Sequence, residues 1–176
     1  MEKRAYFLTG KPGSGKTSII KEVLALTKLN AGGFYTEEIR TQGVRQGFKI
    51  ITLDGKSATL AHINFQSPYR VSKYGVELKE LDEVAVPAIQ EAVRSRELVV
   101  IDEIGKMELF SDSFRQVTLE AIESGKPILG TIMLKPHPWA DRIKQHPAVE
   151  LILVNRANHG QVKERLFLWI ESFQAK

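Results

Sequence analysis

One motif in the sequence has residue types and a spacing that specify a chemistry. Residues 10–17 read GKPGSGKT and match G-x-x-x-x-G-K-[ST], the pattern of a loop that wraps a polyphosphate with its backbone N–H groups. Lys16 supplies a positive charge for the β- and γ-phosphates and is a candidate catalytic residue, while the Thr17 hydroxyl suits Mg²⁺. We predict that the whole loop binds a nucleotide: Gly10, Lys11, Pro12, Gly13, Ser14, Gly15, Lys16 and Thr17.

Two adjacent carboxylates, Asp102 and Glu103, follow the short apolar run at residues 98–101. A P-loop protein needs an acidic group at the end of a neighbouring strand to hold Mg²⁺, so we expect Thr17 and Asp102 to be the metal residues. Glu103 is then a candidate to accept a proton from an attacking water or to orient that water. The alternative is that Glu103 is a solvated loop carboxylate.

Further charged residues are candidates for the same site. Lys106 lies four residues beyond Asp102 and is a candidate catalytic cation for the γ-phosphate, although it is equally suited to neutralise its acidic neighbours. Thr36, Glu37 and Glu38 are a second candidate group near the metal or the attacking water, and the alternative is that they are the polar start of a hairpin. The sequence does not choose among the arginines that are candidates for the γ-phosphate: Arg40, Arg45, Arg70 and Arg156.

Short apolar runs alternate with amphipathic segments along the chain. The runs predict strands at 4–9, 33–40, 98–101, 127–133 and 150–154, and the amphipathic segments predict helices at 16–28, 78–94, 112–124, 139–145 and 160–173. This alternation indicates βαβ units, and therefore an α/β fold with a mostly parallel sheet flanked by helices. Ligands bind beyond the carboxyl ends of such strands, so the predicted site residues meet at one edge.

Four local features modify this framework. Residues 41–62 read as a small antiparallel β-hairpin insertion, with Asp54-Gly55 as a type I′ turn. Residues 63–76 show no period and are predicted to form a loop. Pro87 predicts a kink or a break in its helix, and Ser111 is a candidate N-cap.

Composition limits the class of protein. A chain of 176 residues with 43% apolar and 26% charged residues is typical of one globular domain, here residues 1–176. The absence of cysteine excludes disulfides and thiolate sites. No signal peptide or transmembrane stretch is recognisable, and the basic residues behind the +4 net charge are scattered. We expect a cytoplasmic monomer with neither a membrane nor a nucleic acid as partner.

The segments GKPGSGKT, GFYTEEIR with QGFKI, SKYGVEL, VVIDEIGKMEL and a late NR pair together resemble the thermophile-type nucleoside-triphosphatase family. These are P-loop NTPases of archaea and bacteria, related to the human cancer-related nucleoside triphosphatase. The resemblance covers essentially the whole chain, and DEIGKMEL is its most distinctive piece. It implies a RecA-like P-loop core and slow, Mg²⁺-dependent hydrolysis of ATP, GTP, CTP and UTP to the diphosphate and phosphate, with broad base specificity.

The resemblance also implies further binding residues by position. The second nucleotide-binding segment would consist of Leu98, Val99, Val100, Ile101, Asp102, Glu103, Ile104 and Gly105. Asn155 and Arg156 match the late NR pair and would contact the base, although the flanks in VNRANHG depart from the family pattern.

Two other functions are compatible with a P-loop. A nucleoside or metabolite kinase would need an Arg-rich lid that excludes water, and residues 63–76 contain only one arginine. A nucleotide-gated, RNA-associated binding module would need a basic stripe, which the scattered charges do not supply. The adjacent Asp-Glu pair favours water as the nucleophile, and hydrolysis is therefore the preferred prediction.

Overall fold

The computed structural model describes residues 2–174. Its strands are β1 (Ala5–Thr9), β2 (Ala31–Thr41), β3 (Val44–Thr52), β4 (Ser57–His62), β5 (Arg70–Val71), β6 (Tyr74–Val76), β7 (Leu98–Ile104), β8 (Ile128–Ile132) and β9 (Val149–Leu153). Its α-helices are α1 (Lys16–Leu26), α2 (Leu78–Glu80), α3 (Val86–Ser95), α4 (Asp112–Glu123), α5 (Pro138–Lys144) and α6 (His159–Gln174). Over the described residues, the strands form one sheet in the order β5-β6-β4-β3-β2-β7-β8-β1-β9.

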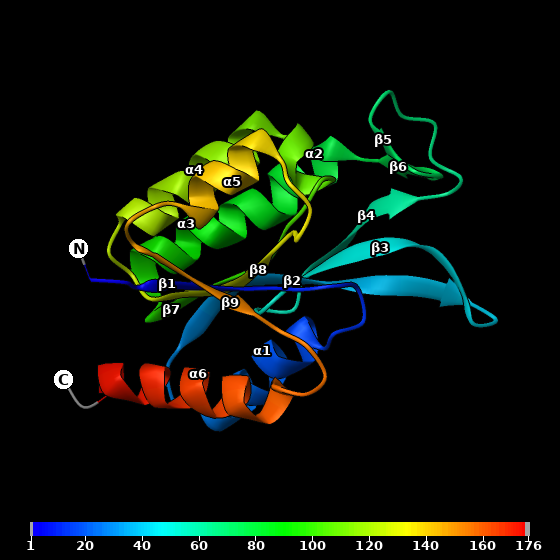
Figure 1. Ribbon diagram of the computed structural model, residues 1–176. Coiled ribbons are helices and arrows are strands. Elements are labelled where there is room, and N and C mark those ends of the chain that lie inside the picture. The colour runs from blue at the N-terminus through cyan, green and yellow to red at the C-terminus, as the bar shows by residue number, and fades with distance from the viewer. Residues whose placement is uncertain (1, 175–176) are drawn as a thin grey trace.

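The core of the sheet is parallel and is covered by helices on both faces, which confirms the predicted α/β class (Figure 1). Helices α3, α4 and α5 lie on one face, and α1 and α6 lie on the other. Side chains of β7 alternate between the two layers, because successive residues of a strand point to opposite faces. Val99 and Ile101 pack under α3 and α4, whereas Leu98 and Val100 pack with α1 and α6. No helix within residues 2–174 is long and apolar enough to cross a membrane.

The antiparallel part of the sheet is larger than predicted and runs from residue 34 to residue 76. β2 pairs with β7 through Phe34 and then continues as the first strand of a hairpin with β3. The type I′ turn lies at Gln42-Gly43, where φ is 51° and 77°, and not at Asp54-Gly55. At the latter only Gly55 has positive φ, and the Thr52 N–H donates to the Lys56 carbonyl across a three-residue loop.

Two further sequence predictions are corrected by local structure. Residues 63–76 are not a plain loop, because they contain the β5–β6 hairpin. Of the kink or break predicted at Pro87, the break is not found, because the helical segment continues from Leu78 to Ser95. Instead a π-helical turn, Leu81–Ala85, joins α2 to α3, and the Val86 N–H donates to the Leu81 carbonyl. The wider turn fits a residue that has no N–H to give to the carbonyl four positions earlier. The Ser111 side chain does cap α4, where it accepts from the Phe114 N–H.

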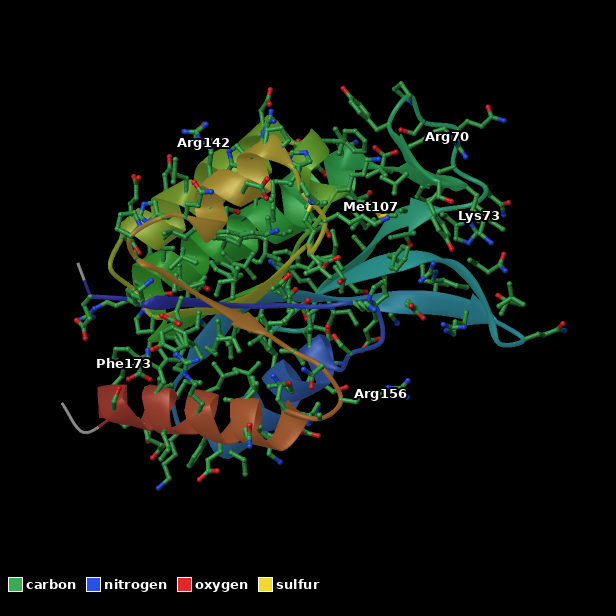
Figure 2. The ribbon with its side chains drawn as sticks, in the orientation of Figure 1. Arg70, Lys73, Met107, Arg142, Arg156 and Phe173 are labelled. Atoms are coloured by element: carbon green, nitrogen blue, oxygen red, sulfur yellow. The ribbon has the colours of Figure 1, made fainter. Side chains whose placement is uncertain are left out.

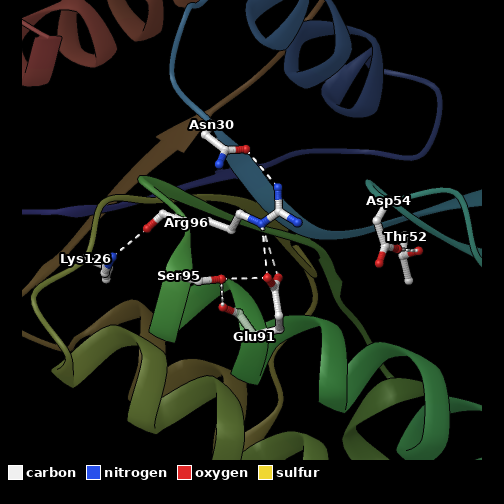
Figure 3. Close-up of polar contacts among 7 residues, drawn as sticks. All are labelled: Asn30, Thr52, Asp54, Glu91, Ser95, Arg96 and Lys126. Atoms are coloured by element: carbon white, nitrogen blue, oxygen red, sulfur yellow. Dashed lines mark hydrogen bonds and ion pairs between the residues drawn. The ribbon is translucent and has the colours of Figure 1, made fainter.

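A polar cluster joins the loops that enter β2, β7 and β8 at the amino edge of the sheet (Figure 3). Arg96 donates to the Asn30 side chain at 2.8 Å and to Glu91 at 3.2 Å, and Lys126 donates to the Arg96 carbonyl. This edge is opposite to the one from which the predicted site residues emerge. The cluster therefore fixes the strand entries and leaves the carboxyl edge for the site.

Gly33 sets how closely β2 approaches β7. Its φ is +110°, and a Cβ added to it would lie 2.0 Å from the Val100 carbonyl oxygen. Any larger residue would push β2 away from the strand that bears Asp102 and Glu103. Gly33 is therefore required by both backbone conformation and packing.

We predict that Gly33→Ala lowers the free energy of unfolding by roughly 3 kcal/mol, because overpacking and backbone strain add at this position. Gly160→Ala is the matched control, since a Cβ there has open space within 4 Å and no positive φ to oppose it. Urea denaturation of both variants measures the difference. Equal stabilities for the two variants would show that the close contact between β2 and β7 is not a constraint.

Candidate functional site

The loop at residues 10–17 joins β1 to α1, as the motif requires. Gly15 caps the helix with φ +91°, and α1 begins at Lys16, so its N-terminal N–H groups open toward the loop. The Lys16 ammonium lies across the loop, where it donates to the carbonyls of Gly10 at 2.9 Å and Lys11 at 3.2 Å. These contacts hold a positive charge in the loop that the motif assigns to the phosphates.

Asp102 is buried, with 2% of its surface exposed. Thr131 on β8 donates to its Oδ1 at 2.7 Å. Burial raises the pKa of Asp102, while the side chains of Thr131 and Thr17 and the charge of Lys16 oppose this rise by favouring the carboxylate. Its other oxygen, Oδ2, is buried without a hydrogen-bond partner among the described residues. A buried polar atom without a partner costs free energy, and carboxylate oxygens are among the ligands that Mg²⁺ takes.

Residues 2–174 contain no group of three or more His, Cys, Asp or Glu side chains arranged to hold a metal by themselves. Mg²⁺ in a nucleotide site takes one or two protein ligands and receives the rest from phosphates and water. The Thr17 hydroxyl and the Asp102 carboxylate are oxygen donors of the type that such a Mg²⁺ takes.

Glu103 also lies in β7, which extends to Ile104 and not only to residue 101 as predicted. The pairing of β7 with β8 shifts between Ile101 and Ile104, so both acids occupy an irregular part of the strand. Burial is the largest cause that raises the pKa of Glu103. The charge of Asp102 raises this pKa further, whereas the charge of Lys16 lowers it. Glu103 is a partly buried carboxylate at the site, and the solvated-loop alternative does not describe it.

Glu108 is a third acid at the site and was missed by the sequence analysis. It is 3% exposed, and burial followed by the charge of Glu103 holds its pKa well above the usual value. A Cβ added to Gly105 would lie 2.9 Å from Glu103 Oε1 and 3.0 Å from Glu108 Oε2, so the glycine leaves room for both side chains. The available sequence signal was the carboxylate in KMEL, six residues after Asp102.

A pocket of about 560 Å³ adjoins the outer side of the phosphate loop. Leu134 and Leu153 supply apolar walls, and Asn155 and Arg156 line the mouth. Asn155 Oδ1 accepts from the N–H groups of residues 157 and 158, while Arg156 extends away from the ribbon (Figure 2). This volume is within the range of small-molecule sites, roughly 300–1,000 Å³. The structure thus places the two predicted base contacts beside the loop.

His159, at the start of α6, was also missed as a neighbour of the loop. A Cβ added to Gly15 would lie 3.0 Å from the His159 ring. The ring therefore covers the turn from which Lys16 projects. Four dispersed histidines gave no sequence signal for this contact, because it depends on how α6 packs against α1.

The other predicted residues differ in exposure and in ion pairing. Lys106 is exposed, and no polar partner holds it among the described residues. Glu37 pairs with Lys21 at 2.9 Å, and Glu38 pairs with the hairpin arginines. Five residues of the second predicted segment are fully buried in the core, so they support the acids and do not line the site: Leu98, Val99, Val100, Ile101 and Ile104.

Comparison with known proteins identifies relatives that all belong to one family. A family model described as NTPase matches residues 5–167. The chain is 46% identical over 162 residues to nucleoside-triphosphatase THEP1 of Thermotoga petrophila, covering 92% of this chain and 90% of that protein. It is 36% identical over 185 residues to the cancer-related nucleoside-triphosphatase of Homo sapiens, covering 96% and 97%. The crystal structure of THEP1 from Aquifex aeolicus matches with a TM-score of 0.86 at 35% identity, covering 94% and 99%.

The raised pKa of Glu108 predicts how stability varies with pH. Because that pKa lies above the ordinary value of 4.5, the folded protein holds this proton more tightly than the unfolded chain does. The resulting stabilisation is fully present below pH 4.5 and is lost as pH rises through the folded-state pKa. We expect Glu108→Gln to remove this loss of stability. The free energy of unfolding of the variant should therefore exceed that of the wild type most under alkaline conditions.

Urea denaturation across pH measures this gain. Glu91→Gln is the control, because hydrogen bonding to Ser95 lowers the pKa of Glu91 and its neutralisation does not relieve a buried charge. Parallel stability curves for Glu108→Gln and the wild type would contradict the assignment of a raised pKa to Glu108.

Proposed function

The chain belongs to the NTPase family and is a nucleoside-triphosphatase, and we propose that it hydrolyses ATP, GTP, CTP and UTP slowly to the diphosphate and phosphate in a Mg²⁺-dependent reaction. The observation that carries the proposal is the buried Oδ2 of Asp102, which has no hydrogen-bond partner among the described residues. Asp102 precedes Glu103 and is influenced by Thr17 and Lys16 of the phosphate loop. This arrangement gives the two acids separate roles. Asp102 holds the metal, and Glu103 accepts a proton from water.

The phosphate loop binds the triphosphate through its backbone N–H groups and the Lys16 ammonium. Thr17 and Asp102 would hold Mg²⁺, which when bound neutralises phosphate charge and helps to position the γ-phosphate. Lys106, exposed beside the acids, is the further cation that we propose for the γ-phosphate.

Glu103 is the proposed general base. Its pKa is raised by burial and by Asp102, and a carboxylate with a raised pKa is a stronger base than an ordinary glutamate. As the water oxygen bonds to the γ-phosphorus, the bond from phosphorus to the β–γ bridging oxygen breaks and the nucleoside diphosphate leaves. The proton of the water passes to Glu103.

The pocket beside the loop supports broad base specificity. Two of its walls are the side chains of Leu134 and Leu153, which contact the face of any base without reading its edge. Asn155 and Arg156 are the proposed polar contacts. Because the Asn155 oxygen already accepts two backbone N–H groups, it is not available to accept from an amino group of one particular base.

Phosphate release without an acceptor separates hydrolysis from kinase action. We expect the protein to release phosphate from each of ATP, GTP, CTP and UTP when Mg²⁺ is the only addition, and to lose this activity when the metal is chelated. Lys16→Ala is expected to abolish nucleotide binding and release together, because the loop then lacks its phosphate cation. A strict requirement for an alcohol or nucleoside acceptor would overturn the hydrolase proposal in favour of a kinase.

Glu103→Gln tests the general base. We expect kcat to fall by about 10²–10⁴-fold with nucleotide binding preserved, because the amide keeps the shape of the side chain but accepts no proton. Glu91→Gln, at the opposite edge of the sheet, should retain wild-type turnover (Figure 3). Wild-type kcat in Glu103→Gln would show that another group activates the water.

A further inference from the structure

A second pocket lies between the β2–β3 hairpin and the β5–β6 hairpin. Its volume is about 350 Å³, and none of its lining residues belongs to the phosphate loop or to the pocket beside that loop. Small-molecule sites start at roughly 300 Å³, so this pocket is large enough for one compact ligand. The lining residues that carry the argument are Arg40, Arg45, Lys73, Phe48, Val71 and Met107.

Two arginines occupy opposite positions on neighbouring strands of this pocket. Arg40 of β2 pairs directly with Arg45 of β3, next to a register shift between Ile39 and Arg40. Like charges placed opposite each other destabilise a hairpin unless they are compensated. One carboxylate, Glu38, serves both, at 2.6 Å from Arg40 and 3.1 Å from Arg45. One carboxylate therefore leaves one of the two guanidinium charges without neutralisation.

Lys73 adds a further positive charge from the facing hairpin. It follows Ser72, whose φ of 53° forms the tight β5–β6 turn, and Figure 2 shows it above the β2–β3 hairpin. Its ammonium lies 5.7 Å from the Tyr74 ring, and no carboxylate pairs with it within residues 2–174. Three cations thus line the pocket, and no acidic side chain lines it.

The pocket is also partly apolar, and other side chains hold one of its arginines in place. Arg45 Nε donates to the Tyr74 hydroxyl at 2.9 Å, and the guanidinium lies 5.2 Å from the Phe48 ring centroid. The side chains of Phe48, Val71 and Met107 are half-buried around it. A guanidinium held in this way loses little conformational freedom on binding a ligand. Flat guanidinium and aromatic surfaces are those on which nucleobases stack.

We propose that this pocket is a second ligand site that binds a nucleoside monophosphate. The phosphate dianion lies among Arg40, Arg45 and Lys73, where it neutralises the positive charge that Glu38 does not balance. The base and ribose lie against Phe48, Val71 and Met107. Because Met107 directly follows Lys106 in the segment that carries Glu108, the occupant contacts the loop next to the acidic site.

Calorimetric titration with AMP tests the proposal on Lys16→Ala protein, in which the phosphate loop no longer competes. We expect one binding site, tighter for AMP than for inorganic phosphate or adenosine alone. Adding Lys73→Glu should weaken AMP binding by about tenfold or more, equivalent to about 1.4 kcal/mol. Lys79→Glu is the matched control, because it makes the same change in net charge at an exposed residue that lies outside the pocket.

Absence of AMP binding, or equal binding by the Lys73→Glu and Lys79→Glu proteins, would overturn the proposal. Inorganic phosphate binding as tightly as AMP would also overturn it, since the pocket would then be an anion site without a role for its apolar wall. If Lys16→Ala does not fold, the titration is repeated on wild-type protein saturated with ADP and Mg²⁺. Lys73→Glu alone should leave NTP hydrolysis unchanged when no monophosphate is added.

Discussion

Burial of the Asp102 carboxylate is the constraint on which the rest of the site depends. A carboxylate removed from water costs several kcal/mol unless its oxygens are satisfied. Thr131 of β8 satisfies one oxygen, and Thr17, at the start of the helix that follows β1, favours the charged form. The sheet order β7-β8-β1 brings these groups together, although they are far apart in the chain. The remaining oxygen is buried without a hydrogen-bond partner among the described residues.

The same constraint explains the electrostatics around the phosphate loop. Asp102, Glu103 and Glu108 lie in one weakly solvated region. Burial raises the pKa values of Glu103 and Glu108, and the charge of a neighbouring carboxylate, Asp102 for Glu103 and chiefly Glu103 for Glu108, raises them further. The charge of Lys16 lowers the pKa values of Asp102 and Glu103. An acid with a raised pKa next to a site for a polyphosphate is suited to proton transfer, so the strain of burying several carboxylates serves the proposed chemistry.

Strand β2 connects the acidic site to a region of opposite charge. Its first half packs beside β7 and depends on Gly33, whereas its second half carries Glu38 and Arg40 into the antiparallel hairpin. The hairpin concentrates positive charge beside Met107, and the parallel core concentrates negative charge around Asp102. One strand thus holds two sites of different chemistry in a fixed relation to each other.

The sequence by itself determined the phosphate loop, the alternation of strands and helices and the Asp102-Glu103 pair, because each is a local pattern of spacing or periodicity. Tertiary structure decided what depends on packing between distant segments. Strand register placed the type I′ turn at Gln42-Gly43, although Asp54-Gly55 offers the same local signal. The turn after β7 folded Glu108 back among the acids, whereas in the sequence it resembles a surface charge. Burial and the proximity of other charges set the pKa values of these acids. Neither can be read from residues that are adjacent in the sequence.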